Sequence, residues 1–217
     1  MAKLIYLSPS DQVDNRYAYG NTTEAVQCRK IADACEAALK RNSFDVINNQ
    51  TSDMYGRVEE SNAKRADLHV CIHTNAHNKS VAGTRLFAWA LEGEGYEAAE
   101  AIFDVLAPLT PGTSENIKTA DFYEIMYTNA PCVYIEVDFH DVSSVAKWIA
   151  EHTEEIGEAI AKGICNHYGV AFKEKVKPVA PTGKLYRVQV GAFAQKANAD
   201  AMVEKLKKAG FEAFITQ

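Results

Sequence analysis

The sequence predicts a three-layer α/β domain with a mostly parallel sheet, followed by a small C-terminal βαβ unit. Three observations support this. Short apolar runs alternate with amphipathic helical segments through residues 1–172, as in α/β domains. Residues 173–183 contain three Lys and two Pro without apolar periodicity, which is typical of a linker. Residues 184–217 then read as one strand, one helix and a second strand.

The elements of the first domain follow from the positions of these runs. Apolar, β-favouring runs predict strands at 3–7, 44–47, from 68 onward, 84–90 and 132–139. Helical periodicity predicts helices at about 24–40, 55–65, 96–106 and 144–168. Pro9 is expected to end the first strand, because proline cannot donate to a strand ladder. A long polar loop then leads to the first helix.

Composition limits the classes of function. The chain has 217 residues and a net charge of −6, and no apolar run approaches the roughly 20 residues of a membrane helix. The net negative charge argues against nucleic acid as a partner. Five scattered cysteines without a CxxC pair predict free thiols and synthesis in a reducing cytoplasm. The first residues turn polar too soon for a secretory signal.

Polar side chains that can bind a metal follow two of the expected strands. The run at 68–72 leads into His73, and the run at 132–135 leads into Glu136. In an extended strand Glu136, Asp138 and His140 would share one face. A carboxylate in an apolar strand is costly unless it is paired, metal-bound or protonated. With Glu24 opening a helix at the same edge, this set of nitrogen and oxygen ligands suits Zn²⁺ with an open position for water.

Several motifs then make the first domain familiar. The chain carries Ile5-Tyr6-Leu7-Ser8-Pro9, Gly20-(x3)-Glu24, Arg57-(x4)-Asn62-(x3)-Ala66-Asp67, Ile72-His73-Thr74-Asn75-Ala76, Gly83-Thr84 and Pro131-(x3)-Ile135-Glu136-Val137. In order and spacing these resemble the zinc-dependent N-acetylmuramoyl-L-alanine amidases of the type-3 family. The resemblance implies hydrolysis of the amide bond between muramic acid and the L-alanine of the peptidoglycan stem peptide.

The resemblance also assigns roles to single residues. His73 and Glu24 match two zinc ligands, and Glu136 matches the catalytic glutamate, which would move a proton from water to the leaving nitrogen. Asp138 or Asp141 would orient a ligating histidine.

The third ligand departs from the family, because the loop after the first strand has no histidine. Three alternatives remain open. His140 supplies the missing imidazole, which we favour; Asp11 or Gln12 ligates from the original loop; or the site binds metal weakly and catalysis is lost. We read His69 as structural, and His77 and Lys118 as solvated.

The C-terminal segment resembles the first repeat of a SPOR domain, a module that binds peptidoglycan glycan strands. The resemblance rests on residues 186–193, on Ala197-Asn198-Ala199 and on Leu206-Lys207-Lys208-Ala209-Gly210-Phe211. One βαβ repeat of about 35 residues is too small to fold well alone and leaves strand edges open. We therefore expect a homodimer through residues 184–217, with Val188 and Val190 against the helix and Arg187 and Gln189 facing glycan.

The expected protein is thus a peptidoglycan amidase with a wall-binding tail. Without a signal peptide, it would be made in the cytoplasm and reach the wall after release, as a phage or prophage endolysin does. The alternative is a catalytically inactive amidase fold that only binds wall glycan.

Overall fold

The computed structural model describes residues 2–175 and 188–216. The chain divides into two compact units, Met1–Lys175 and Val176–Gln217, which are considered separately below. Within the described residues, no helix is both long and apolar enough to cross a bilayer.

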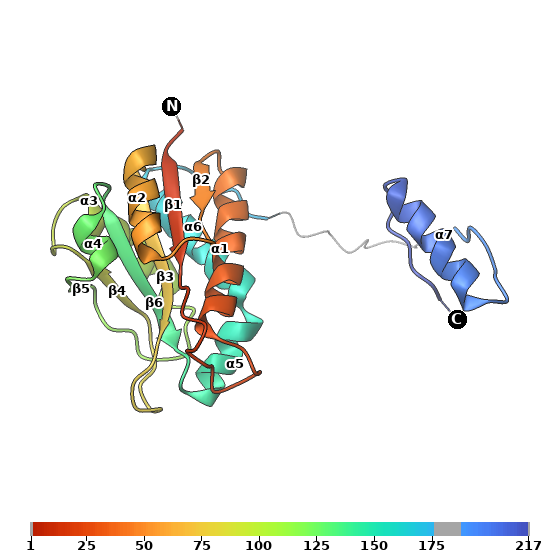
Figure 1. Cartoon of the computed structure of the whole chain (residues 1–217), viewed down its shortest axis with the longest axis horizontal. Helices are drawn as coiled ribbons and strands as arrows, with labels where there is room; N and C mark the ends of the chain where they lie inside the picture. The colour runs from red at the N-terminus through yellow and green to blue at the C-terminus, as the bar shows by residue number, and fades with distance from the viewer. Residues whose placement is uncertain (1, 176–187, 217) are drawn as a thin grey trace. The chain divides into compact units, whose positions relative to one another are not determined.

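A six-stranded sheet in the order β2-β1-β3-β6-β4-β5 forms the centre of the first unit (Figure 1). The strands are β1 Leu4–Pro9, β2 Asp45–Asn48, β3 Leu68–Asn75, β4 Arg85–Ala88, β5 Lys118–Thr119 and β6 Cys132–Phe139. Among neighbouring strands in the sheet, β4 and β6 are antiparallel to each other, and all other neighbours are parallel. The mostly parallel sheet is as the sequence predicted, apart from the two-residue β5.

Helices cover both faces of the sheet. They are α1 Glu24–Arg41, α2 Met54–Lys64, α3 Glu94–Leu106, α4 Tyr123–Tyr127, α5 Ser143–Glu151 and α6 Thr153–His167. On one face, α1, α3 and α6 pack on each other and on the apolar side of the strands, where Ile5, Val70 and Ile135 are fully buried. On the other face α2 packs against α4. The expected three-layer arrangement is confirmed.

Strand alternation gives the face beneath α2 and α4 its polar character. Along β3, Leu68, Val70 and Ile72 belong to the main core, so His69, Cys71 and His73 point to the opposite face. One face of this buried strand therefore belongs to the apolar core, and the other face carries polar side chains.

The helix expected at 144–168 is in fact two helices, α5 and α6, which meet at His152. His152 has φ −122° and ψ 21°, outside helical geometry, and its Nδ1 bonds the carbonyl oxygen of Trp148 at 2.7 Å. That carbonyl lies four residues earlier, so the imidazole takes the position that a backbone N–H group has in a regular helix. The periodicity continues across the break, which hid it from sequence analysis.

The expectation that Glu136, Asp138 and His140 share one face is wrong. Glu136 is in register with His73, but Phe139, not Asp138, is in register with Asn75. One extra residue in β6 therefore forms a bulge after Glu136, and simple alternation does not continue beyond it. Asp138 accepts hydrogen bonds from the backbone N–H groups of Gly83 and Phe139, both at 2.7 Å, and does not orient a histidine.

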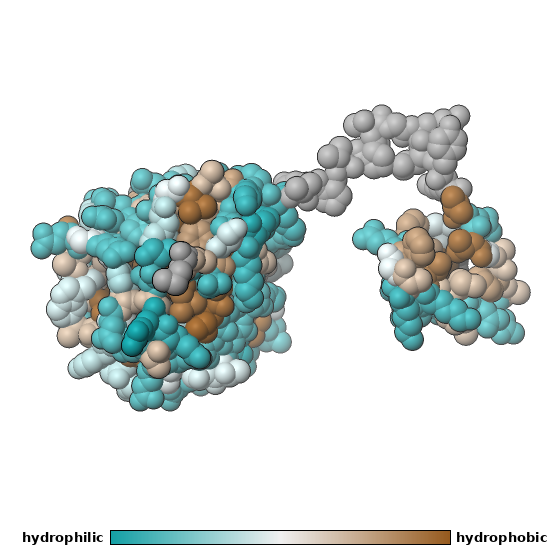
Figure 2. Space-filling view, turned by 90° about the horizontal axis from the view of Figure 1, so that it is seen from above, coloured by the Kyte–Doolittle hydropathy of each residue, from teal (hydrophilic) through white to brown (hydrophobic). Residues whose placement is uncertain are grey.

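The second unit contains one described helix, α7 Lys196–Lys208, as predicted. The two strands expected beside it are not formed at residues 188–193 or 211–216. Val188 and Val190 are 86% and 58% exposed, so the expectation that they pack on the helix is also wrong. Arg187 lies outside the described residues. Figure 2 shows the apolar side chains gathered on one face of this unit.

Candidate active site

A buried carboxylate–imidazole pair lies where β3 ends and α1 begins. Glu24, the first residue of α1, is 1% exposed, and its Oε1 accepts a hydrogen bond from His73 Nδ1 at 2.8 Å. Asn15 Nδ2 donates to the other oxygen at 2.8 Å. Burial alone would raise the pKa of Glu24, but the hydrogen bond and charge of His73 lower it below the ordinary value. Glu24 is therefore held ionised against His73.

His73 responds in the opposite sense. Burial disfavours the imidazolium, but the hydrogen bond to Glu24 and the negative charges of Glu136 and Glu24 raise the pKa of His73. The ring stacks on Tyr134 with centroids 4.5 Å apart, which fixes its plane. Two carboxylates thus act on one imidazole, and the site favours a positive charge at this point.

Glu136 stands beside this pair on β6, in register with His73. Its Oε2 is buried and has no hydrogen-bond partner. Burial raises the pKa of Glu136 to about 7, against the opposing charge of His73. A buried carboxylate oxygen without a partner costs free energy. Such an oxygen indicates a site where a ligand or metal binds.

His140 lies next to the pair but on the other side of β3. Its Nδ1 is 2.9 Å from Thr74 Oγ1, and its ring stacks on Tyr17 at 5.0 Å between centroids. Tyr17 also donates a hydrogen bond to Thr74 Oγ1 at 3.0 Å. Burial lowers the pKa of His140, so the ring is neutral near pH 7 and keeps a lone pair for a metal.

The other candidates from the first loop are less buried. Gln12 is tied to Glu24 through Asn15, whose Nδ2 also donates to Gln12 Oε1 at 2.5 Å. Asp11 is half-buried and Gln12 is exposed. His77 is exposed as well, and Lys118 forms an exposed ion pair with Glu115.

The predicted ligands do not form one tight cluster. Across residues 2–175 and 188–216, one group of three or more His, Cys, Asp or Glu side chains has ligand atoms all within 4.8 Å, namely His69, Cys71 and Cys132. Glu24 and His73 touch, but His140 is not gathered with them by this measure. The pair and the unpartnered Glu136 oxygen fit a bound cation.

Comparison with known proteins identifies the family. Residues 9–166 match the family described as N-acetylmuramoyl-L-alanine amidase. The chain belongs to this amidase family. Residues 174–217 match the SPOR domain family, so both motif-based resemblances are confirmed.

Relatives and solved structures agree with this assignment. A sporulation-specific N-acetylmuramoyl-L-alanine amidase of Bacillus subtilis is 27% identical over 222 residues, covering 97% of this chain and 83% of the relative. The N-acetylmuramoyl-L-alanine amidase CwlM of Bacillus licheniformis is 26% identical over 171 residues, covering 77% and 64%. The catalytic domain of the amidase CwlV from Bacillus (Paenibacillus) polymyxa superposes with a TM-score of 0.71 at 20% identity, covering 78% of this chain and 99% of that one.

The chain is therefore a peptidoglycan amidase that cleaves the bond between N-acetylmuramic acid and L-alanine. Sequence reasoning did not find three residues of the amidase site, Asn15, Tyr17 and Thr74. Asn15 lies in a polar loop and Thr74 inside a strand, and nothing in their spacing marks them as partners of Glu24 and His140.

Proposed function

We propose that the amidase is a zinc enzyme in which Glu24, His73 and His140 bind the metal and Glu136 is the general base. The observation that carries this proposal is the buried Glu24–His73 contact beside a carboxylate oxygen of Glu136 that has no partner. When bound, Zn²⁺ would polarise the scissile carbonyl and lower the pKa of a water molecule.

The protein's own groups have separate roles in the reaction. Glu136 accepts the proton of the attacking water and delivers it to the alanine nitrogen as the amide bond breaks. Asn15 holds the second oxygen of Glu24, so that Glu24 presents Oε1 toward His73. Tyr134 keeps the imidazole of His73 in one plane, so both partners of the pair are oriented before substrate binds.

His140 is preferred as the third ligand because it is neutral, 3% exposed and next to Thr74, whose backbone N–H lies 3.4 Å from Glu24 Oε1. Asp11 and Gln12 remain alternatives because Gln12 is linked to Glu24 through Asn15.

Zinc content by elemental analysis tests the site. We expect one catalytic zinc in the wild type, its loss in His140→Ala and in His73→Ala, and its retention in His77→Ala, a control histidine that is exposed. Retention in His140→Ala would move the third ligand to Asp11 or Gln12. Absence of zinc from the wild type, with no muropeptide cleavage, would support the alternative of an inactive glycan-binding protein.

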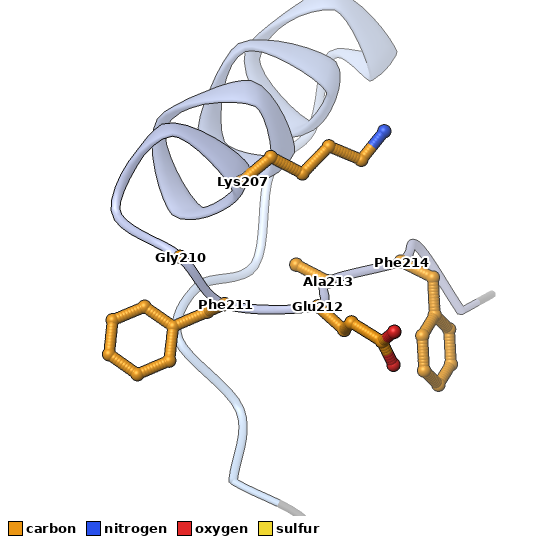
Figure 3. A pocket seen from close by; sticks show the side chains of 6 residues that line it. All are labelled: Lys207, Gly210, Phe211, Glu212, Ala213 and Phe214. Carbon is orange, nitrogen blue, oxygen red and sulfur yellow. The ribbon is translucent and has the colours of Figure 1, made fainter. Parts of the chain in front are cut away.

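We also propose that the C-terminal unit pairs with a second copy of itself. The described part of this unit buries no residue of α7 and leaves a set of large apolar side chains exposed: Val188, Val190, Phe193, Phe211, Phe214 and Ile215. Figure 3 shows the rings of Phe211 and Phe214 projecting from the segment after α7, beside Glu212. A second copy offers the same apolar surface and the missing strand partners.

Light scattering on the full chain tests the pairing. The wild type is expected to be a dimer, and Phe214→Asp a monomer, because a carboxylate would be buried without a partner in the interface. Lys205→Asp, a charge change at an exposed position of α7, is the control and should leave the dimer intact. A wild-type monomer would refute the proposal.

Arg187 and Gln189 are the proposed glycan contacts, and their replacement by Ala should weaken sedimentation with glycan strands that lack stem peptides. The role as a phage or prophage endolysin stays a prediction. Lysis of intact target cells by added enzyme measures it.

A further inference from the structure

A second set of metal-binding side chains lies on the same two strands as the active site. His69 and Cys132 are in register on β3 and β6, and His73 and Glu136 are in register four residues further along. Both pairs lie on the face beneath α2 and α4. His69 and Cys71 are fully buried and Cys132 is 6% exposed.

The ligand atoms of His69, Cys71 and Cys132 already converge. The two Sγ atoms are 4.0 Å apart, and all three ligand atoms lie within 4.8 Å of one another. In a tetrahedral zinc site with Zn–S bonds of about 2.3 Å, two sulfurs are about 3.8 Å apart. A small contraction of the group would therefore bring it to the geometry of a Cys₂His site.

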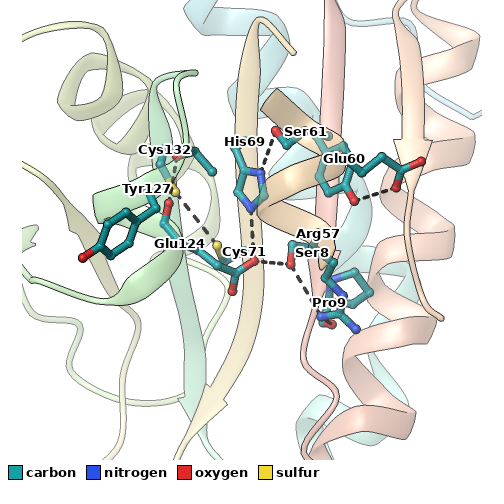
Figure 4. Close-up of polar contacts among 12 residues, drawn as sticks. Ser8, Pro9, Arg57, Glu60, Ser61, His69, Cys71, Glu124, Tyr127 and Cys132 are labelled. Carbon is teal, nitrogen blue, oxygen red and sulfur yellow. Dashed lines mark hydrogen bonds and ion pairs between the residues drawn. The ribbon is translucent and has the colours of Figure 1, made fainter. Parts of the chain in front are cut away.

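A carboxylate lies beside these three side chains. Glu124 Oε1 accepts a hydrogen bond from His69 Nε2 at 3.1 Å. Figure 4 shows Glu124 between His69 and Ser8 and near Cys71. On the other side of the His69 ring, Ser61 Oγ forms a hydrogen bond with Nδ1 at 3.0 Å. A contact of this kind orients a histidine that binds a metal.

We propose that His69, Cys71, Cys132 and Glu124 bind one thiophilic divalent cation, Zn²⁺ or a similar d¹⁰ ion, as a structural site separate from the active site. On binding, each thiol releases one proton to solvent and both sulfurs ligate as thiolates. The single proton of the His69 imidazole moves from Nε2 to Nδ1, where Ser61 Oγ accepts it, and Nε2 becomes the nitrogen ligand.

Charge balance supports this assignment. Two thiolates neutralise the cation, and the remaining charge of Glu124 is matched by the buried guanidinium of Arg57. Ser8 connects these two, because its hydroxyl donates to Glu124 and lies 3.5 Å from Arg57 Nη1. The buried group is therefore neutral both with the cation and without it, which avoids the cost of an uncompensated interior charge.

A cavity lies beside the group. Its volume is about 400 Å³, and Cys132, Ile125 and Met126 are among the residues that line it. The exposed carboxylates of Glu92 and Glu94 line it too and would attract cations. A bound ion would join β3, β6 and α4 below the active site, and so fix the register that sets His73 beside Glu136.

Cobalt substitution in the full chain tests the proposal. Co²⁺ bound by thiolate gives an intense ultraviolet charge-transfer absorption that Co²⁺ on histidine and carboxylate ligands lacks. After removal of metal with a chelator, two equivalents of Co²⁺, one for each proposed site, should give this band in the wild type. The band should be lost in Cys71→Ser and in Cys132→Ser. It should remain in Cys28→Ser, the matched control, because Cys28 is a buried thiol near Glu24.

Two further variants separate this site from the active site. His73→Ala should keep the thiolate band even if it loses the catalytic zinc and all cleavage. Ser61→Ala should weaken cobalt binding about 10- to 100-fold, as expected for loss of an orienting contact. Absence of the band in the wild type, or its persistence in the Cys71→Ser/Cys132→Ser double variant, would overturn the proposal.

If the cysteine variants do not fold, the wild type still decides. In moderate urea, Zn²⁺ should slow alkylation of Cys71 and Cys132, read for each cysteine by mass spectrometry. The rates for Cys35 and Cys165, which lie elsewhere in the core, provide the reference. Equal rates with and without Zn²⁺ would overturn the proposal.

Discussion

The two units of the chain differ in how far their apolar side chains are buried. In the first unit, large apolar side chains such as Ile31, Leu39 and Ile160 are fully buried by helices that cover the sheet. In the second, α7 buries no residue and Phe214 is 82% exposed. The first unit is complete in one chain, whereas the second carries an apolar surface that a single copy does not cover. Catalysis should therefore depend on single residues of the first unit, and assembly on the second.

The largest effect is expected from Glu136→Gln. The amide keeps the size of the side chain but cannot take a proton from water, so kcat/KM should fall about 10²- to 10⁴-fold. Muropeptide release measured by chromatography gives the rate, with Glu59→Gln, an exposed acid, as control. Unchanged cleavage would remove Glu136 from the mechanism. The dimer should persist, since the two units act separately.

Two truncations, one in each unit, show which side chains stabilise the first unit. Leu39→Ala leaves a cavity between α1 and the sheet and should reduce the free energy of unfolding of this unit by about 2–5 kcal/mol. Phe214→Ala removes a ring of the second unit that is exposed in a single copy, and should change the free energy of unfolding of the first unit by less than about 0.5 kcal/mol. Both tryptophans, Trp89 and Trp148, are in the first unit, so fluorescence during urea unfolding reports on that unit. Equal effects would mean that the tail packs on the first unit.

The border of the first unit gives an intermediate effect. Asn42 ends α1, is 3% exposed, donates to the Ala38 carbonyl at 2.9 Å and accepts the backbone N–H of Lys173 at 2.7 Å. Asn42→Ala leaves both backbone groups without this partner and should cost about 1–3 kcal/mol. Proteolysis after residue 172 should also become faster than in the wild type. An unchanged cleavage rate would show that this contact does not hold the end of the unit.

The smallest effect should depend on pH. Burial would raise the pKa of Asp67, but hydrogen bonds from Lys3 and from the Leu4 amide lower it below the ordinary value. The ionised carboxylate thus stabilises the fold above its unfolded pKa of about 3.9, and this stabilisation is lost as pH falls through the lower folded value. Asp67→Asn should cost about 1 kcal/mol at pH 7, and the difference from the wild type should shrink below about pH 4. A constant difference across this range would exclude the charge as its origin.

Sequence reasoning succeeded where one residue pattern has one structural solution. The apolar runs at 68–72 and 132–135 could only be buried strands, and their positions placed His73 and Glu136 side by side. It failed where structure depends on a local choice between two nearly equal options. His152 breaks a helix through a single side-chain bond, and one extra residue after Glu136 moves Asp138 and His140. It also failed in the tail, where strands need partners that one copy does not supply.

The bulge in β6 has a consequence for how this enzyme tolerates change. Up to Glu136, each residue of β6 is held by its ladder to β3, so a substitution there is felt by the neighbouring strand. Beyond the bulge the pairing resumes, with Phe139 opposite Asn75 and the His140 amide donating to the Asn75 carbonyl at 2.8 Å, and Asp141 then accepts the His77 and Lys79 amides. The bulge thus changes which face the side chains after Glu136 point to, while the strand stays paired with β3 on both sides of it. A saturation mutagenesis scan should show strict positions through Glu136 and on to the buried His140, and permissive ones only from Asp141 onward.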